Sequence, residues 1–279
     1  MIDCHTHTQF SVDSEADINL MCHRAAELGL EAYAITDHCE CNCWYGEEYY
    51  NGTVKATDFG YSKDFENSVA AVTRLKEEYG DRLNLICGTE MGQAMHDLSV
   101  AEKIISDPRL DFVIGSVHQI RGFEDFAFID YKKYTTDELY DLLERYFGEV
   151  YELCRWGEFD ILGHLTYTLR YISGACGIKV DISRFREMIA ESFRALIYNG
   201  CGIEINTSGL RQAYGKTFPG IEHVKLYKDL GGELLSIGSD AHTVEDLGKG
   251  VAEGAEIAKA AGFSHICYFR NRKPVFIGI

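Results

Sequence analysis

The chain of 279 residues carries 27 Lys and Arg against 44 Asp and Glu, which gives a formal net charge of −17. Such a charge repels phosphodiester backbones, and no Lys/Arg-rich stretch offsets it locally, so a polynucleotide partner is disfavoured. The composition, 46% hydrophobic and 25% charged, excludes a disordered chain, and no apolar run is long enough to span a membrane. The length suits either two average domains or one α/β barrel.

Short β-branched or apolar runs alternate with segments of helical periodicity, which predicts successive βα units around a parallel sheet. Three amphipathic stripes, at residues 18–28, 139–153 and 182–197, predict helices, and Gly200 stands where a helix C-cap glycine is expected. No linker or internal repeat divides the chain, so we expect one domain over residues 1–279. Seven predicted strands span residues 1–5, 32–36, 84–90, 112–118, 161–165, 202–206 and 234–240.

Residues 39–63 do not fit the alternation and predict a long loop after the second strand, of the kind that often acts as a lid. Within it, Cys39, Cys41 and Cys43 form a Cys-x-Cys-x-Cys cluster that could bind zinc. The cluster lacks the paired Cys-x-x-Cys spacing of structural zinc modules, so we do not favour a separate cysteine site. Ten scattered cysteines without a signal peptide indicate the reducing cytosol, and we expect a cytoplasmic protein.

Metal-ligand residue types stand at the end of almost every predicted strand. The first strand runs into Asp3-Cys4-His5-Thr6-His7, where alternation points Asp3, His5 and His7 to one side, although two polar rings can also stand at a strand end by chance. The carboxyl ends of parallel barrel strands share one face, where barrel active sites lie, so we expect these residues to converge. The later strand ends carry Asp37-His38, Glu90, His118, His164 and Asp240-Ala241-His242.

The order of these motifs resembles the PHP (polymerase and histidinol phosphatase) superfamily over almost the whole chain. The motifs are Asp-x-His-x-His, Ile-Thr-Asp-His, Gly-Thr-Glu, Ser-Val-His, Gly-His and Ser-Asp-Ala-His, ending at residues 7, 38, 90, 118, 164 and 242. Phe-Ser-x-Asp-Ser at residues 10–14 and Asn-Thr-Ser-Gly-Leu-Arg at 206–211 are similar to the monofunctional histidinol-phosphate phosphatases of that superfamily. The resemblance implies a distorted (β/α)7 TIM-like barrel of the α/β class, with a metal site at the C-terminal ends of the strands.

The resemblance also implies three divalent metal ions. Zinc, iron and manganese all suit mixed imidazole and carboxylate ligands. Some superfamily members have a histidine at the position of Asp13, so the oxygen ligand here can change the metal preference of that site. The implied ligands are His5, His7, Glu90 and Asp240 for the first metal, Glu90, His118 and His164 for the second, and Asp13, His38 and His242 for the third. Glu90, Asp240 and His242 are the predicted catalytic residues.

Candidate substrate contacts follow the fifth and sixth predicted strands. Arg170 and Arg211 can bind phosphate oxygens through planar guanidinium groups, and Asn206 can add a neutral hydrogen bond.

Two aspartates next to the ligand histidines are predicted to support them. Asp3 and Asp37 are expected to accept a ring N–H from a ligand histidine, with direct coordination as the alternative. Asp160, four residues before His164, suits a strand-start role at least as well.

Together these features predict a metal-dependent phosphomonoester hydrolase. The favoured reaction converts L-histidinol phosphate and water to L-histidinol and phosphate, a step of histidine biosynthesis. One alternative is a PHP-family phosphatase or phosphodiesterase acting on another small phosphate ester or a nucleotide. Another is a barrel that has lost its chemistry, although every expected ligand position still holds His, Asp or Glu. The sequence does not indicate an oligomeric state.

Overall fold

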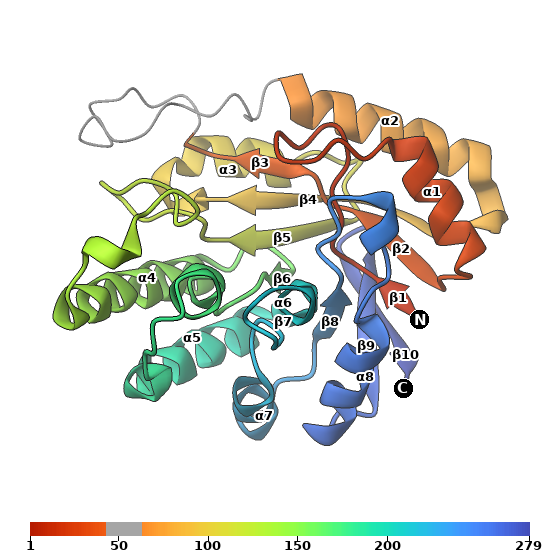
Figure 1. The fold of residues 1–279 in the computed structure, drawn as a ribbon. Coiled ribbons are helices and arrows are strands. Elements are labelled where there is room, and N and C mark those ends of the chain that lie inside the picture. Colours follow the sequence, from red (N-terminus) through yellow and green to blue (C-terminus); the bar gives the residue numbers. More distant parts are fainter. Residues whose placement is uncertain (43–62) are drawn as a thin grey trace.

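The structure is a computed structural model that describes residues 1–42 and 63–279. Its main sheet is parallel, with the barrel strands in chain order (Figure 1). The sheet closes on itself, because Cys4 N donates to Ile237 O at 2.9 Å and Asp240 N donates to His5 O at 2.8 Å. The predicted distorted TIM-like barrel is confirmed. Its strands are β1 (Ile2–Asp3), β2 (Ala32–Ile35), β4 (Leu85–Gly92), β5 (Phe112–Ser116), β6 (Ile161–Leu162), β7 (Gly202–Asn206) and β8 (Leu235–Gly238).

The segment after β2 differs from the prediction. The chain does not enter a loop at residue 39, because β3 (His38–Glu40) pairs with β4 in the same parallel sense as β2. His-Cys-Glu has none of the β-branched or aromatic residues that mark a strand, so β3 is set by its pairing with β4 rather than by propensity. Residues 43–62, with Cys43 among them, lie outside the described residues, and a lid there stays a prediction.

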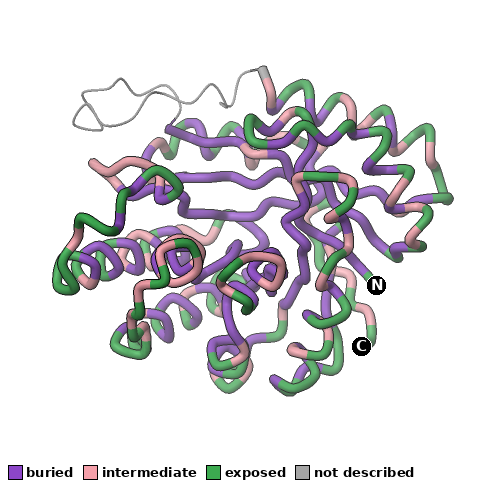
Figure 2. The backbone as a smooth tube through the Cα atoms, viewed as in Figure 1, coloured by how far each residue is buried: buried purple, intermediate pink, exposed green. Residues whose placement is uncertain are grey.

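Helices surround the barrel and pack their apolar faces against it, while their outer faces remain exposed (Figure 2). The three predicted stripes correspond to α1, α4 and α5, and Gly200 ends α5 with a φ of 74°. Among the described residues, no helix has the length and apolar character needed to cross a membrane. The helices are α1 (Ile18–Glu27), α2 (Lys63–Tyr79), α3 (Leu98–Ile105), α4 (Thr136–Trp156), α5 (Arg186–Asn199), α6 (Ser208–Arg211), α7 (Ile221–Asp229) and α8 (Val251–Ala260).

A C-terminal hairpin that the sequence did not predict lies at the opposite end of the barrel from the ligand residues. It consists of β9 (His265–Arg270) and β10 (Lys273–Gly278), and Arg272 in its turn donates from Nε to Asp160 Oδ2 at 2.7 Å. Asp160 stands immediately before β6, where its side chain also accepts from Val113 N. Asp160 is therefore a strand-start residue, remote from the C-terminal mouth.

Candidate metal centre

The structure brings the nine predicted metal-ligand residues together at the C-terminal mouth of the barrel. His5, His7 and Asp13 follow β1, four members lie on or just after β3 to β6, and the last two follow β8. Most of the side chains are buried, which is expensive for polar groups unless they bind one another or a cation. The nine residues are His5, His7, Asp13, His38, Glu90, His118, His164, Asp240 and His242.

Glu90 lies at the centre of this cluster with only 1% of its surface exposed. Its Oε2 lies 3.1 Å from both His5 Nε2 and His38 Nδ1. Its Oε1 lies 3.0 Å from His118 Nε2 and 2.7 Å from His164 Nε2. Oε2 also lies 3.4 Å from His7 Nε2. Because the two carboxylate oxygens face different sets of imidazoles, Glu90 is placed to serve two neighbouring cations.

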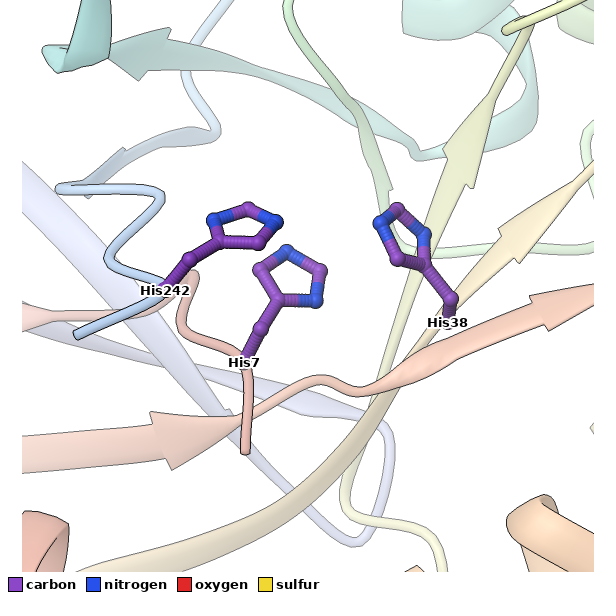
Figure 3. Close-up of side chains that lie close together, drawn as sticks. All are labelled: His7, His38 and His242. Carbon is purple, nitrogen blue, oxygen red and sulfur yellow. The ribbon is translucent and has the colours of Figure 1, made fainter. Parts of the chain in front are cut away.

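A second group of imidazoles lies beside Glu90. The His7 ring stacks between two others, with its centroid 4.3 Å from that of His38 and 4.2 Å from that of His242 (Figure 3). Stacked imidazoles that share one charge sign repel each other, and the pKa of His7 falls to about 3 through burial and the neighbouring charges of His242 and His38. A neutral imidazole is the form that coordinates a metal.

The donor atoms fit divalent metals. In the described part of the chain, four trios of side chains have ligand atoms within 4.8 Å of one another. All are imidazole nitrogens or carboxylate oxygens, the set that suits zinc, iron or manganese. These trios are His5-His7-Glu90, Glu90-His118-His164, His7-His38-His242 and His38-Glu40-His118. The first two fall within the predicted first and second ligand sets, and the third contains two members of the predicted third set.

Asp13 completes that third set from the loop before α1. Its Oδ2 lies 3.1 Å from His242 Nε2 and 3.5 Å from His38 Nε2. Burial raises the pKa of Asp13, but the charge of His38 and the hydrogen bond from His242 outweigh it and hold that pKa well below its usual range. Asp13 is therefore an ionised oxygen donor between two imidazoles.

Asp240 links the metal cluster to Arg170. Its Oδ1 lies 3.4 Å from His7 Nε2, while its Oδ2 accepts from Arg170 Nη2 at 2.7 Å. Burial raises the pKa of Asp240, yet Arg170 and His7 hold it well below the ordinary value. The backbone of Asp240 has a φ of 54°, an uncommon conformation for a residue other than glycine. Arg211 Nη2 donates to the Asp240 carbonyl at 3.4 Å, so both predicted arginines lie at this side of the site.

Both arginines keep a donor free for a further acceptor. Arg170 Nε and Arg211 Nη1 are buried and have no hydrogen-bond partner among the described residues. Buried donors are rarely left unpaired, and a guanidinium group with an open donor is suited to a phosphate oxygen. The guanidinium carbon of Arg170 also lies 5.1 Å from the ring centroid of Tyr167, which holds it over the mouth.

Asn206 ends β7, the sixth barrel strand, as the sequence predicts. It is fully buried, its Nδ2 donates to Glu204 Oε2 at 3.3 Å, and its Oδ1 accepts from the N and Oγ of Ser208. These groups are bonded within the protein, and the substrate contact of Asn206 stays a prediction. Asn206 instead orients Glu204 and Ser208.

Two glutamates that the sequence analysis missed hold the ligand histidines. Glu204 Oε1 accepts from His5 Nδ1 at 2.7 Å, and Glu40 Oε1 accepts from His118 Nδ1 at 2.9 Å. Each carboxylate binds Nδ1 of its histidine and so turns Nε2 of that ring toward Glu90. A charged residue inside the apolar strand β7 was a visible signal for Glu204, whereas Glu40 stood in a segment expected to be a loop.

The aspartates expected in that supporting role have other partners. Asp3 accepts from Ser239 N and Gly248 N, so it ties β1 to the chain after β8. Asp37 accepts from Thr8 N and from the hydroxyl groups of Thr8, Ser11 and Ser68. The expectation that these two carboxylates accept ring N–H groups is wrong, because backbone and hydroxyl donors take up their oxygens.

A model of the PHP domain family matches residues 3–208, most of the chain. The chain belongs to the PHP family. This PHP chain is 29% identical over 267 residues to a Thermotoga maritima protein described as a probable histidinol-phosphatase, covering 95% of this chain and 94% of the relative. It is 26% identical to the histidinol-phosphatase of Lactococcus lactis, covering 98% of this chain and 95% of that one.

The PHP fold is also seen in a crystal structure of histidinol phosphate phosphatase from Lactococcus lactis, complexed with zinc, L-histidinol and phosphate. It superposes with a TM-score of 0.79 at 24% identity and covers 98% of each chain. The family match ends at residue 208, so Asp240 and His242 join the PHP site through the geometry described above.

Proposed function

We propose that this PHP protein is a metal-dependent phosphomonoester hydrolase that converts L-histidinol phosphate and water to L-histidinol and phosphate. The observation that carries the proposal is the cluster around Glu90 with two arginine donors open beside it. The relatives named histidinol-phosphatase align over nearly the whole chain, which supports this substrate. The neighbouring structure that holds zinc, L-histidinol and phosphate has the same fold and supports it further.

Three divalent ions, chosen from zinc, iron and manganese, are the proposed cofactors. His5, His7, Glu90 and Asp240 would hold the first, Glu90, His118 and His164 the second, and Asp13, His38 and His242 the third. Such ions supply positive charge for the phosphate oxygens and activate a water molecule for attack. Phosphate-monoester hydrolysis needs help of this kind, since it is among the slowest uncatalysed reactions.

The chain's own residues supply orientation and charge. Arg170 Nε and Arg211 Nη1 bind two oxygens of the phosphoryl group, and Asp240 keeps Arg170 in position through its 2.7 Å ion pair. Glu90 and Asp240 provide the negative charge around which the imidazoles gather. His242 is a quarter exposed at the mouth, where it can meet the incoming ester.

Phosphate release by the purified protein, loaded in turn with zinc, manganese or iron, tests the proposal. L-histidinol phosphate is compared with a panel of sugar phosphates, nucleotides and single-stranded DNA, and protein stripped with a chelator is the control. We expect metal-dependent release with the highest kcat/KM for L-histidinol phosphate. No phosphate release from that ester by any loaded form would contradict the substrate, and preference for DNA would favour the phosphodiesterase alternative.

A further inference from the structure

Asp125 lies on the segment after β5 that folds back over the metal cluster. Phe126 N donates to the carbonyl of His118 at 3.1 Å, which returns the chain to the residue that carries a metal-facing imidazole. The Phe126 ring meets the edge of Tyr167 at a centroid distance of 6.3 Å. The centroid of the Tyr167 ring in turn lies 5.2 Å from that of His118 and 4.9 Å from that of His164. Asp125 is therefore part of the wall beside the β5 and β6 side of the site.

The Asp125 carboxylate has no cationic partner among the residues that the structure describes. One oxygen accepts from Ala127 N at 2.7 Å, and within residues 1–42 and 63–279 no Lys, Arg or His forms an ion pair with either oxygen. Burial raises the pKa of Asp125 to about 6, against the opposing charge of His118. A partly buried carboxylate without a counter-charge is unfavourable, so this position favours a cation supplied from outside the chain.

The surroundings of Asp125 also suit a cation. The negative charge of Asp125 acts on the hydroxyl groups of Tyr131, Tyr167 and Tyr171 and raises the pKa of each, after burial as the larger cause. The Tyr131 and Tyr171 rings stack at 6.4 Å, and Tyr167 meets Tyr171 edge to face at 5.3 Å. Tyrosine rings near a carboxylate are a common setting for an ammonium group.

Tyr167 lies between Arg170, the proposed phosphate contact, and the segment that carries Asp125. Arg170 lies over its ring, with the guanidinium carbon 5.1 Å from the centroid. Phe126, the neighbour of Asp125, lies at the edge of the same ring. An ester whose phosphoryl group binds Arg170 would extend its alcohol half across Tyr167 toward Asp125.

We propose that Asp125 binds the primary ammonium group of the alcohol half of the substrate and so selects phosphate monoesters of amino alcohols. This inference rests on the proposed function, because L-histidinol phosphate carries such a group two carbons from its ester oxygen. Asp125 is then a specificity residue, and it contributes to binding of the alcohol half rather than to the phosphate chemistry.

The Asp125→Asn variant tests the inference with three probes. These are L-histidinol phosphate, its deamino analogue 3-(imidazol-4-yl)propyl phosphate, and p-nitrophenyl phosphate. Asparagine has the same shape and can keep the hydrogen bond from Ala127 N, so the wall should be preserved. Glu124→Gln is the matched control, because Glu124 is the preceding residue and its charged partner is Lys133 rather than the metal cluster. Metal content and thermal unfolding are measured for each variant.

We expect Asp125→Asn to lower kcat/KM for L-histidinol phosphate by roughly 10- to 100-fold, mainly through KM, as for a lost hydrogen bond between charged groups. The two probes without an ammonium group should change less than about twofold, within the usual effect of a neutral substitution. Glu124→Gln should behave as the wild type on all three probes. L-histidinol should inhibit p-nitrophenyl phosphate hydrolysis by the wild type more strongly than by Asp125→Asn.

Equal losses of kcat/KM in Asp125→Asn on all three probes, or no loss on any of them, would overturn the role of Asp125. The proposed function would still stand if the wild type hydrolyses L-histidinol phosphate. A wild type that hydrolyses p-nitrophenyl phosphate but neither hydrolyses L-histidinol phosphate nor is inhibited by L-histidinol would overturn both. The two failures are thus distinguished by the wild-type data alone.

Discussion

Glu204 accepts a hydrogen bond from Nδ1 of His5 at 2.7 Å, although the two residues are 199 positions apart in the sequence. The other oxygen of Glu204 accepts from the backbone N of His164 at 2.9 Å. One carboxylate on β7 therefore positions residues of two predicted metal sites at once. Its burial at 1% exposure excludes water as a competing donor.

Glu204→Gln should weaken metal binding at the predicted first site. The amide would present a donor toward either His5 Nδ1 or His164 N, both of which are donors now, so one contact must be lost. Loss of such a supporting carboxylate typically lowers metal affinity about 10- to 100-fold. Competition of the zinc-loaded variant with a coloured chelator measures the affinity, and Glu233→Gln, an exposed glutamate before β8, serves as the control. Unchanged zinc affinity in Glu204→Gln would show that His5 needs no such support.

Glu90→Ala should abolish hydrolysis and leave the barrel folded. Glu90 is the carboxylate shared by the two sets of imidazoles, so its removal takes away an oxygen ligand from both predicted sites. We expect phosphate release to fall at least about 100-fold, because metal assistance is worth several kcal/mol. Circular dichroism checks the fold and metal analysis checks the occupancy. A fully active variant would refute the shared role of Glu90.

Arg170→Lys should not recover the kcat/KM for L-histidinol phosphate that Arg170→Ala loses. A lysine supplies one point charge, whereas Arg170 binds Asp240 and Ser208 through Nη2 and still presents Nε to a ligand. Both variants should lose roughly 10- to 100-fold in kcat/KM for L-histidinol phosphate, the value expected for hydrogen bonds to a charged group.

The control for the arginine is Arg194→Lys, an exposed residue of α5 that pairs with Glu187 and Glu191. Metal content is measured alongside kcat and KM, because Arg170 also holds the predicted ligand Asp240. Wild-type kcat/KM in Arg170→Lys would mean that charge alone is sufficient at this position.

Asp17 should contribute a pH-dependent part of the stability through the N-terminus of α1. Its side chain accepts from Leu20 N and Asn19 N, and the hydrogen bond from Leu20 N lowers the pKa of Asp17 below its ordinary value of 3.8. A depressed carboxyl pKa stabilises the folded state above the unfolded pKa, and this contribution is lost as the pH falls through the folded pKa.

Asp17→Ala should therefore cost about 0.5 to 2 kcal/mol at pH 7, as for other lost helix caps. The difference in Tm from the wild type should narrow below about pH 4, where the unfolded carboxyl takes up its proton. Asp17→Asn, which keeps a capping oxygen, should stay close to the wild type at pH 7. If the Tm difference between Asp17→Ala and the wild type is the same at pH 7 and pH 3, the charge of Asp17 does not contribute to the stability.

The sequence was sufficient for the parts of this protein that depend on local pattern. Hydrophobic periodicity predicted the seven barrel strand positions and the helices α1, α4 and α5, because a residue's face on a strand or helix follows from its spacing alone. The motifs at the strand ends indicated which side chains meet, since parallel strands in a barrel share one C-terminal face. The clusters around Glu90 and His7 follow from that rule.

Only the tertiary structure decided the contacts that join distant strands. The partners of Glu204, Glu40 and Asp3, the burial of Asn206 and the pairing of β3 depend on how the barrel closes and on its register. A carboxylate binds whichever donor the closed barrel brings within about 3 Å, and sequence spacing does not specify that donor. The sequence by itself thus determined the barrel and the convergence of its ligand-type residues, whereas the folded chain decided which carboxylates orient them and which guanidinium donors remain open.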